Sequence, residues 1–89
     1  MARVRGGAVA ASLTSAQKRI RVTLGRKVKD LRLSLEMTQA DLAEEAEVRR
    51  ALVSEVERGE ANPTLDSIVR IAIALGVDAA ELLGSDRRG

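Results

Sequence analysis

Apolar residues recur at helical spacing from about Ser15 onward, and almost no stretch alternates in the manner of a β-strand. The first apolar stripe has spacings of 4, 4, 3 and 4 residues and consists of Ile20, Leu24, Val28, Leu31 and Leu35. Such a stripe predicts a first helix of about twenty residues with one buried face.

A short second helix is expected after Met37. Thr38 followed three residues later by Asp41 fits a capping box, in which each side chain accepts a backbone N–H of the other residue. The positions expected to be buried by this helix are Leu42, Ala43 and Ala46. The third expected helix begins near Arg50 and ends at Gly59, because glycine readily adopts the left-handed conformation that closes a helix. Its inner side carries Val53 and Val56.

Two further helices complete the predicted fold. The fourth follows a turn at residues 62–64, where Thr64 is a second N-cap, and it ends at Gly76. Its expected inner face consists of Leu65, Ile68, Ile71, Ala72 and Leu75. Residues 78–81 repeat the capping-box pattern before a last short helix that carries Leu82 and Leu83. The pattern therefore predicts a compact all-α domain of five helices.

The composition of the 89 residues removes several classes of function. The chain has no Phe, Trp, Tyr, Cys or His. Without Cys or His it lacks disulfides, Ser–His nucleophiles and the usual metal sites, so we expect no cofactor, no metal and no catalytic residues. Without aromatic residues it has no platform on which single-stranded bases stack. No apolar run reaches the length of a membrane span or a secretory signal, so we expect a cytoplasmic protein without a membrane partner.

Charge is distributed unevenly along the chain. The net charge is only +2, but residues 1–32 carry nine Lys and Arg against one acid and reach +8. Residues 33–89 carry six Arg against twelve acids and reach −6. A basic segment joined to an acidic body indicates an anionic partner such as nucleic acid, although a solvated tail would give the same pattern.

The charge pattern and the helical periodicity together predict three segments. Residues 1–14, with Arg3 and Arg5, are expected to form a flexible basic arm. Residues 15–83 are expected to form the helical domain, and residues 84–89 a disordered tail.

Several short motifs occur in a specific order and spacing over residues 24–83. They are Leu24-Gly25, Leu31-Arg32, Met37-Thr38-Gln39-Ala40-Asp41-Leu42-Ala43, Val56-Glu57-Arg58-Gly59, Asn62-Pro63-Thr64-Leu65 and Ala74-Leu75-Gly76-Val77 through Glu81-Leu82-Leu83. In this arrangement the chain resembles the Cro/lambda-repressor-like helix-turn-helix family, often called the XRE family. The resemblance implies a lambda-repressor-like DNA-binding domain whose helix-turn-helix, at about residues 38–58, consists of helices 2 and 3. It also implies an ion pair between Arg32 and Glu57 that holds the first helix on the third.

The third expected helix has the chemistry to read bases. The residues on its outward face, opposite the expected buried valines, are Arg50, Ala51, Ser54, Glu55 and Arg58. Arg50 suits guanine and Glu55 suits the amino group of cytosine, while Ala51 can touch a thymine methyl group. The resemblance places base-reading side chains at Arg50, Ala51, Ser54 and Glu55. The alternative is a solvated helix face without a ligand.

Other polar residues are expected to contact DNA phosphates or flanking bases. They are Gln39, Arg49, Arg58, Asn62, Arg3 and Arg5. The resemblance places Gln39 at the start of the second helix, where free N–H groups and the helix dipole favour an anion. The other contacts would fix the register on DNA without reading its sequence.

The chain departs from the family pattern at three positions. The family usually has glycine where this chain has Glu36 and Glu47, because the backbone there tends to need a positive φ. Either these turns take another path or each tolerates about 1 kcal/mol of strain. Arg49 also stands where a Ser or Thr usually caps the third helix.

The resemblance implies a sequence-specific regulator of transcription that binds double-stranded DNA. We expect a bacterial repressor that reads a palindromic operator as a homodimer, because two subunits double a weak half-site contact. The expected dimer interface consists of Val69, Ile73, Leu82 and Leu83. The alternative is a protein-interaction module, such as an antitoxin or a coactivator-like adaptor, whose main partner is a protein. The acidic body and the missing turn glycines favour that alternative.

Overall fold

The structure is a computed structural model that describes residues 8–84. It contains five helices: α1 (Ala8–Ser34), α2 (Gln39–Ala46), α3 (Arg50–Glu57), α4 (Leu65–Leu75) and α5 (Ala79–Leu83). The described residues contain no strand, which confirms the predicted all-α fold. Across these residues no helix combines the length and the apolar character that crossing a membrane requires.

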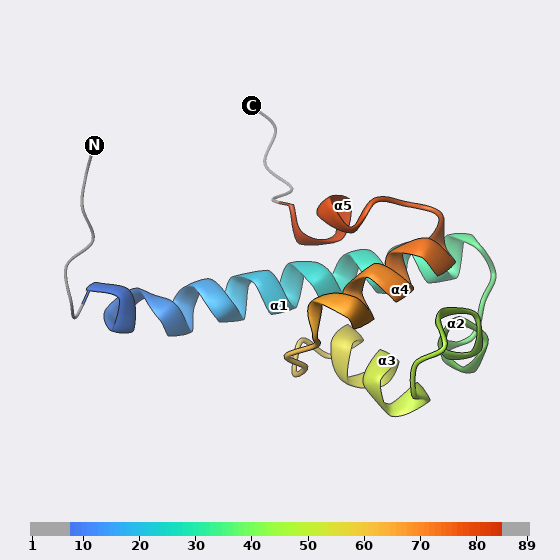
Figure 1. The fold of residues 1–89 in the computed structure, drawn as a ribbon, viewed down its shortest axis with the longest axis horizontal. Helices are drawn as coiled ribbons and strands as arrows, with labels where there is room; N and C mark the ends of the chain where they lie inside the picture. The colour runs from blue at the N-terminus through green and yellow to red at the C-terminus, as the bar shows by residue number, and fades with distance from the viewer. Residues whose placement is uncertain (1–7, 85–89) are drawn as a thin grey trace.

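The long helix α1 organises the fold. Helices α3, α4 and α5 all pack against α1, and α2 packs against α3 and α4. Figure 1 shows these helices gathered around the C-terminal half of α1, while its N-terminal half projects beyond them. The helix-turn-helix formed by α2 and α3 therefore lies on one side of the body.

One apolar core holds the five helices together. Its buried members are Leu24, Val28, Leu42, Ala43, Ala46, Val53, Val56, Ala61, Ile68, Ile71, Ala72, Leu75 and Leu82. Three predicted core residues lie outside it: Ile20, Leu35 and Leu65 are 44%, 50% and 68% exposed. Ile20 lines an open pocket between α1, α5 and the start of α4, and Leu35 follows the end of α1. Leu65 is the first residue of α4 and misses the inner stripe of that helix.

Helix α1 begins earlier than the apolar stripe predicts. Residues 8–14 are helical, so they belong to α1 and not to a flexible arm. Alanine is the residue that most favours a helix, and Ala8, Ala10 and Ala11 continue the helix toward the N-terminus. Arg3 and Arg5 lie outside the described residues, as does the expected tail after Gly84.

Side chains cap two of the helices as predicted. The Thr38 hydroxyl accepts the N–H of Asp41 at 2.9 Å, and the Asp41 carboxylate accepts the N–H of Thr38 at 2.9 Å. These bonds hold the pKa of the Asp41 carboxyl below its ordinary value. Thr64 caps α4 by accepting the N–H of Ser67 at 3.1 Å.

The capping box predicted for the last helix is wrong. Asp78 makes no side-chain cap, because the N–H of Glu81 donates to the main-chain carbonyl of Asp78 at 3.0 Å.

Candidate nucleic-acid interface

Helix α3 presents the predicted base-reading residues to solvent. Arg50, Ala51 and Glu55 are exposed and Ser54 is half-buried. The opposite side of α3 is anchored in the core by Val53 and Val56, which are 0% and 1% exposed. The structure therefore brings the four residues to one outward face.

Two left-handed residues set the path of the chain into the helix-turn-helix. Glu36 and Glu47 both have a φ of 57°, so the turns keep the conformation that usually selects glycine. Glu47 closes α2, and its N–H donates to the carbonyl of Glu44 at 3.2 Å. Arg49 then begins α3 without a side-chain cap, as expected.

Helices α1 and α3 touch through their backbones at Gly25. A β-carbon at Gly25 would run into the carbonyl oxygen of Val56 and would lie 3.0 Å from that of Glu57. Only glycine permits this approach, because any side chain would force the two helices apart. The orientation of α3 is therefore fixed directly by α1.

A buried ion pair provides the second link between α1 and α3. The Arg32 guanidinium donates to both Glu57 oxygens, at 2.7 and 3.0 Å, and to the carbonyl of Met37 at 2.7 Å. The two side chains are 10% and 4% exposed, which confirms the pairing that the resemblance implies. The guanidinium donates to the Glu57 carboxylate and to the Met37 carbonyl, so the charge of Arg32 is not left unpaired in the core.

Gln39 completes this cluster and had not been expected there. Its amide nitrogen donates to Glu57 at 3.0 Å, so a predicted DNA contact also supports the α1–α3 link. Burial by itself would raise the pKa of Glu57. Hydrogen bonds from Arg32 and Gln39, with the positive charges of Arg32 and Lys29, hold that pKa below its ordinary value instead. Glu57 is thus a charged acceptor in the folded protein.

The predicted cationic contacts differ in their surroundings. Arg49 and Arg50 are exposed, and neither side chain makes a hydrogen bond or ion pair with the part of the chain that the structure describes. Arg58 is paired with Glu60 at 3.1 Å and also donates to the hydroxyl of Ser54. Ser54 only accepts in this bond, so its hydroxyl hydrogen is still available to a further acceptor.

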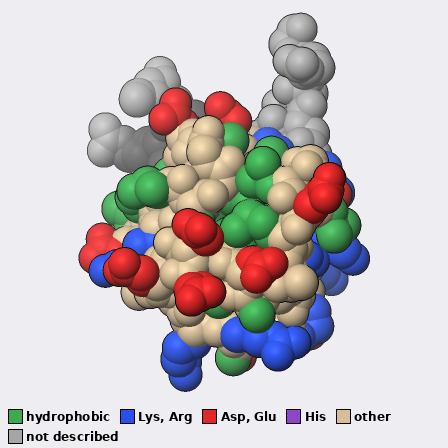
Figure 2. Space-filling view, turned by 90° about the vertical axis from the view of Figure 1, so that its right-hand side faces the viewer, with side chains coloured by type: hydrophobic (Ala, Val, Ile, Leu, Met, Phe, Trp, Pro, Cys, Tyr) green, Lys and Arg blue, Asp and Glu red, His purple; other side chains and the backbone are tan. Residues whose placement is uncertain are grey.

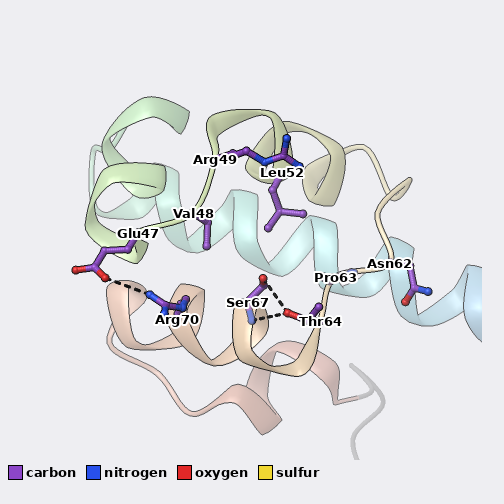
Figure 3. A pocket seen from close by; sticks show the side chains of 9 residues that line it. All are labelled: Glu47, Val48, Arg49, Leu52, Asn62, Pro63, Thr64, Ser67 and Arg70. Carbon is purple, nitrogen blue, oxygen red and sulfur yellow. Dashed lines mark hydrogen bonds and ion pairs between the residues drawn. The ribbon is translucent and has the colours of Figure 1, made fainter.

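A shallow groove of about 580 Å³ joins the N-terminal end of α3 to that of α4. Figure 3 shows Arg49 and Asn62, two predicted phosphate contacts, at its rim. Thr64 and Ser67 line its α4 side, and Arg70 is bonded to Glu47 at 3.1 Å. Sequence reasoning did not place these α4 residues near α3, because only the packing of the two helices brings them together.

Charge around the interface is mixed. In Figure 2, Lys and Arg side chains gather along the lower edge of the end face, at the height of α3 in Figure 1. Asp and Glu side chains occupy the middle of the same face. An acidic surface beside the basic edge limits the nonspecific attraction of phosphate groups.

The expected dimer interface is only partly exposed. Val69 and Ile73 are 40% and 73% exposed, and Leu83 retains 36%. Leu82 is fully buried, so its assignment to a dimer surface is wrong: it is a core residue that attaches α5 to the body.

Comparisons with known proteins identify the family to which the chain belongs. A family model described as helix-turn-helix matches residues 28–82. The chain is 45% identical over 65 residues to control protein C.BamHI of Bacillus amyloliquefaciens, a match that covers 72% of this chain and 80% of that protein. It is 32% identical over 65 residues to the immunity repressor protein of Bacillus phage phi105, covering 73% of this chain and 45% of the phage protein.

Solved structures agree with the family model. A hypothetical transcription factor NHTF from Neisseria superposes with a TM-score of 0.73 and 33% identity, over 79% of this chain and 80% of that one. The restriction-modification controller protein C.AhdI from Aeromonas hydrophila gives a TM-score of 0.67 and 34% identity, over 70% and 94%. The region that the family model matches, residues 28–82, contains α2, α3 and α4 in full. The chain belongs to the helix-turn-helix family, as a Cro/lambda-repressor-like (XRE-type) DNA-binding regulator of transcription.

Proposed function

We propose that the protein is a dimeric, sequence-specific repressor that binds a palindromic operator through the major groove. The outward face of α3 carries the proposal, because this face is polar, exposed and held rigidly from behind by the core. Similarity to an immunity repressor and to two controller proteins supports a regulatory role of this kind.

Direct reading of bases is assigned to four residues of α3. Arg50 has a free guanidinium at the first turn of α3 and suits the two acceptors of guanine. Glu55 lies more than one turn further along the same face and suits a cytosine amino group. Ala51 between them leaves room for a thymine methyl group, and the Ser54 hydroxyl can donate to a base while it accepts the bond from Arg58.

Phosphate contacts would position the protein on the duplex. In Figure 3 Arg49 lies on the α3 side of the groove and Asn62 at one end of it, so both can contact the backbone beside the major groove. Gln39 contributes from the first turn of α2, where free N–H groups and the helix dipole favour an anion. Arg3 and Arg5 are assigned to the flanking backbone from the sequence alone.

Dimerisation is assigned to the exposed aliphatic surface of α4 and α5. Val69 and Ile73 are spaced one helical turn apart, and Leu83 belongs to the helix packed beside them. A two-fold dimer buries such a patch against itself and presents two copies of α3 to DNA.

Selection from a pool of random DNA duplexes at about physiological salt tests the proposal. We expect an enriched palindrome whose half-sites lie about one helical turn apart. Selection of no sequence would contradict the proposal and favour the protein-interaction module.

A pair of arginine variants then tests the role of α3. Arg50→Ala should relax one base position in each half-site, at a cost of about 1–3 kcal/mol for the preferred base. Arg70→Ala is the matched control, because it removes the same charge from α4. The control should leave the selected sequence unchanged. If both variants keep the full base preference, α3 does not read the operator through Arg50.

A further inference from the structure

The side of α1 that faces α3 carries a stripe of basic residues. Its members, which follow one side of the helix with spacings of three, eight and three residues, are Lys18, Arg21, Lys29 and Arg32. Gly25, where α1 touches the backbone of α3, lies in the middle of this stripe. The only acid among residues 8–34 is Asp30, which belongs to another side of the helix. The stripe therefore contains no negative charge of its own.

The body of the protein neutralises only the C-terminal half of this basic stripe. Glu57 accepts two hydrogen bonds from Arg32, and the charge of Lys29 helps to lower the pKa of the same carboxyl group. Lys18 and Arg21 make no ion pair with the part of the chain that the structure describes. Within residues 8–84, the N-terminal half of the stripe is thus a positive surface without an acidic partner.

This unpaired half of the stripe lies beside the loop that connects α3 and α4. Arg21 and Asn62 line the same small pocket, and a β-carbon added at Gly59 would lie 3.7 Å from the main-chain oxygen of Arg21. Asn62 also lies at one end of the groove in Figure 3. Lys18 is exposed one turn further along α1, on the same side. The surface proposed to contact phosphate at Asn62 therefore continues onto α1.

The dimensions of the major groove bring a phosphate backbone toward α1. The groove is about 8.5 Å deep, whereas a helix with its side chains is about 10–12 Å across. When α3 lies in the groove, the sugar-phosphate ridges on both sides rise nearly to the level of the helix that packs behind α3, which is α1. Figure 1 shows the N-terminal half of α1 continuing past α3. Long Lys and Arg side chains on that half can reach such a ridge.

We propose that the N-terminal half of α1 is a second DNA-contacting surface, on which Lys18 and Arg21 bind the phosphate backbone beside the α3–α4 loop. This contact reads no base, but it fixes the register of α3 in the groove. It also supplies phosphate attraction that the acidic residues 33–89 do not provide. The assignment rests on the proposed binding of α3 in the major groove, but not on the sequence that α3 prefers or on dimerisation.

The salt dependence of binding to a labelled duplex of random sequence tests the contact. Each phosphate contact adds about 0.9 to the slope of log affinity against log salt concentration. Lys18→Gln and Arg21→Gln should therefore each reduce that slope by about 1 per bound chain. Melting temperatures measured in parallel should show that the variants are folded.

Arg19→Gln is the matched control for both variants. It removes the same charge from the same turn of α1, but Arg19 lies on the α5 side of that helix, where it lines a pocket with Thr23 and Leu83. This control should leave the slope nearly unchanged, because its side chain points away from the α3–α4 loop.

A tethered cleavage reagent locates the contact on the selected operator. The chain has no cysteine, so one introduced cysteine carries an iron chelate at a single position. Thr14→Cys lies one turn before Lys18 on the same side of α1, whereas Ser12→Cys lies on nearly the opposite side of a helix about 10–12 Å wide. The Thr14→Cys conjugate should cut the backbone next to the base pairs that α3 reads, and the Ser12→Cys conjugate should cut it clearly less.

The outcomes separate this contact from the proposed reading of bases. If Lys18→Gln and Arg21→Gln change the slope no more than Arg19→Gln does, α1 does not contact DNA, whereas Arg50→Ala still decides base reading by α3. If selection enriches no sequence but both slopes fall as expected, the phosphate contact stands and sequence reading is refuted. Equal cutting by the two conjugates would overturn the placement of α1 beside the backbone.

Discussion

Two glutamates hold backbone conformations that glycine adopts without steric cost. Glu36 and Glu47 have positive φ at the ends of α1 and α2. Glu47 gains an exposed hydrogen bond from Arg70, and such surface pairs contribute little. Glu36 makes no hydrogen bond through its side chain within residues 8–84. The strain at Glu36 is therefore not offset by a contact.

Replacement of Glu36 by glycine should stabilise the protein. We expect Glu36→Gly to raise the free energy of unfolding by about 1 kcal/mol, because the relief of backbone strain exceeds the added entropy of the unfolded chain. For a domain of this size the melting temperature should rise by about 4–8 °C. Glu44→Gly, in the middle of α2, is the control and should lower it. A lower melting temperature for Glu36→Gly would show that the turn is not strained.

Single-residue roles were predictable where the motif specifies them. The Arg32–Glu57 pair followed from the resemblance. The missing glycines left two alternatives for the turns at Glu36 and Glu47, and the structure shows the left-handed one. The bond from Gln39 to Glu57 did not, because a polar residue expected to face DNA gives no sign of a second partner inside the protein.

Helices were predicted well where capping residues and apolar periodicity agree. Thr38 and Thr64 begin α2 and α4, and Gly76 ends α4. The start of α1 was missed because the predicted stripe began at Ile20, although Val9 and Leu13 lie on the same side of the helix. Leu65 was assigned to the core because the predicted apolar stripe of α4 was extended one residue too far toward its N-cap, Thr64.

The contact between α1 and α3 can be tested at Gly25. Alanine normally stabilises a helix relative to glycine by about 0.5–1 kcal/mol. At Gly25 the added methyl group meets the backbone of α3, so Gly25→Ala should instead destabilise the protein by about 1–3 kcal/mol. Urea unfolding measures the difference, with Ser12→Ala on the exposed part of α1 as the control. Stabilisation by both variants would mean that the helices are not in backbone contact.

The whole molecule combines a basic first helix, an acidic remainder and a polar α3 face. Glu55 and Glu60 lie close to the arginines of α3, so a single domain is expected to hold DNA weakly. Two joined domains bind as a unit with a much higher effective concentration for the second half-site. Dimerisation is thus the property on which the proposed repression depends most.

A charge in the α4 surface should separate the two subunits. Ile73 is 73% exposed, so Ile73→Glu is tolerated in the monomer and opposes burial in a dimer. We expect monomers by sedimentation and at least about a tenfold loss of affinity for the full palindrome. Leu33→Glu, at an exposed position of α1, is the control and should remain dimeric. If Ile73→Glu still sediments as a dimer, the interface lies elsewhere.

The architecture as a whole was predictable because five helices with short connections leave few arrangements, and the motif selects one. Which apolar residues face outward was less predictable. Leu82 and Leu83 are neighbours in sequence, yet Leu82 is buried and Leu83 is 36% exposed. Only the orientation of α5 against α1 distinguishes them.

The direct backbone contact at Gly25 leaves α3 without a hinge relative to α1. A ligand that tilted α3 alone would have to separate the backbones of α1 and α3 at Gly25. It would also have to break the buried Arg32–Glu57 ion pair. A conformational change of α3 is therefore a poor means of regulating this domain, whereas a change in protein concentration is an effective one. When monomers predominate, the concentration of a dimeric repressor grows with the square of the total protein, so a modest rise in synthesis would switch its operator sharply.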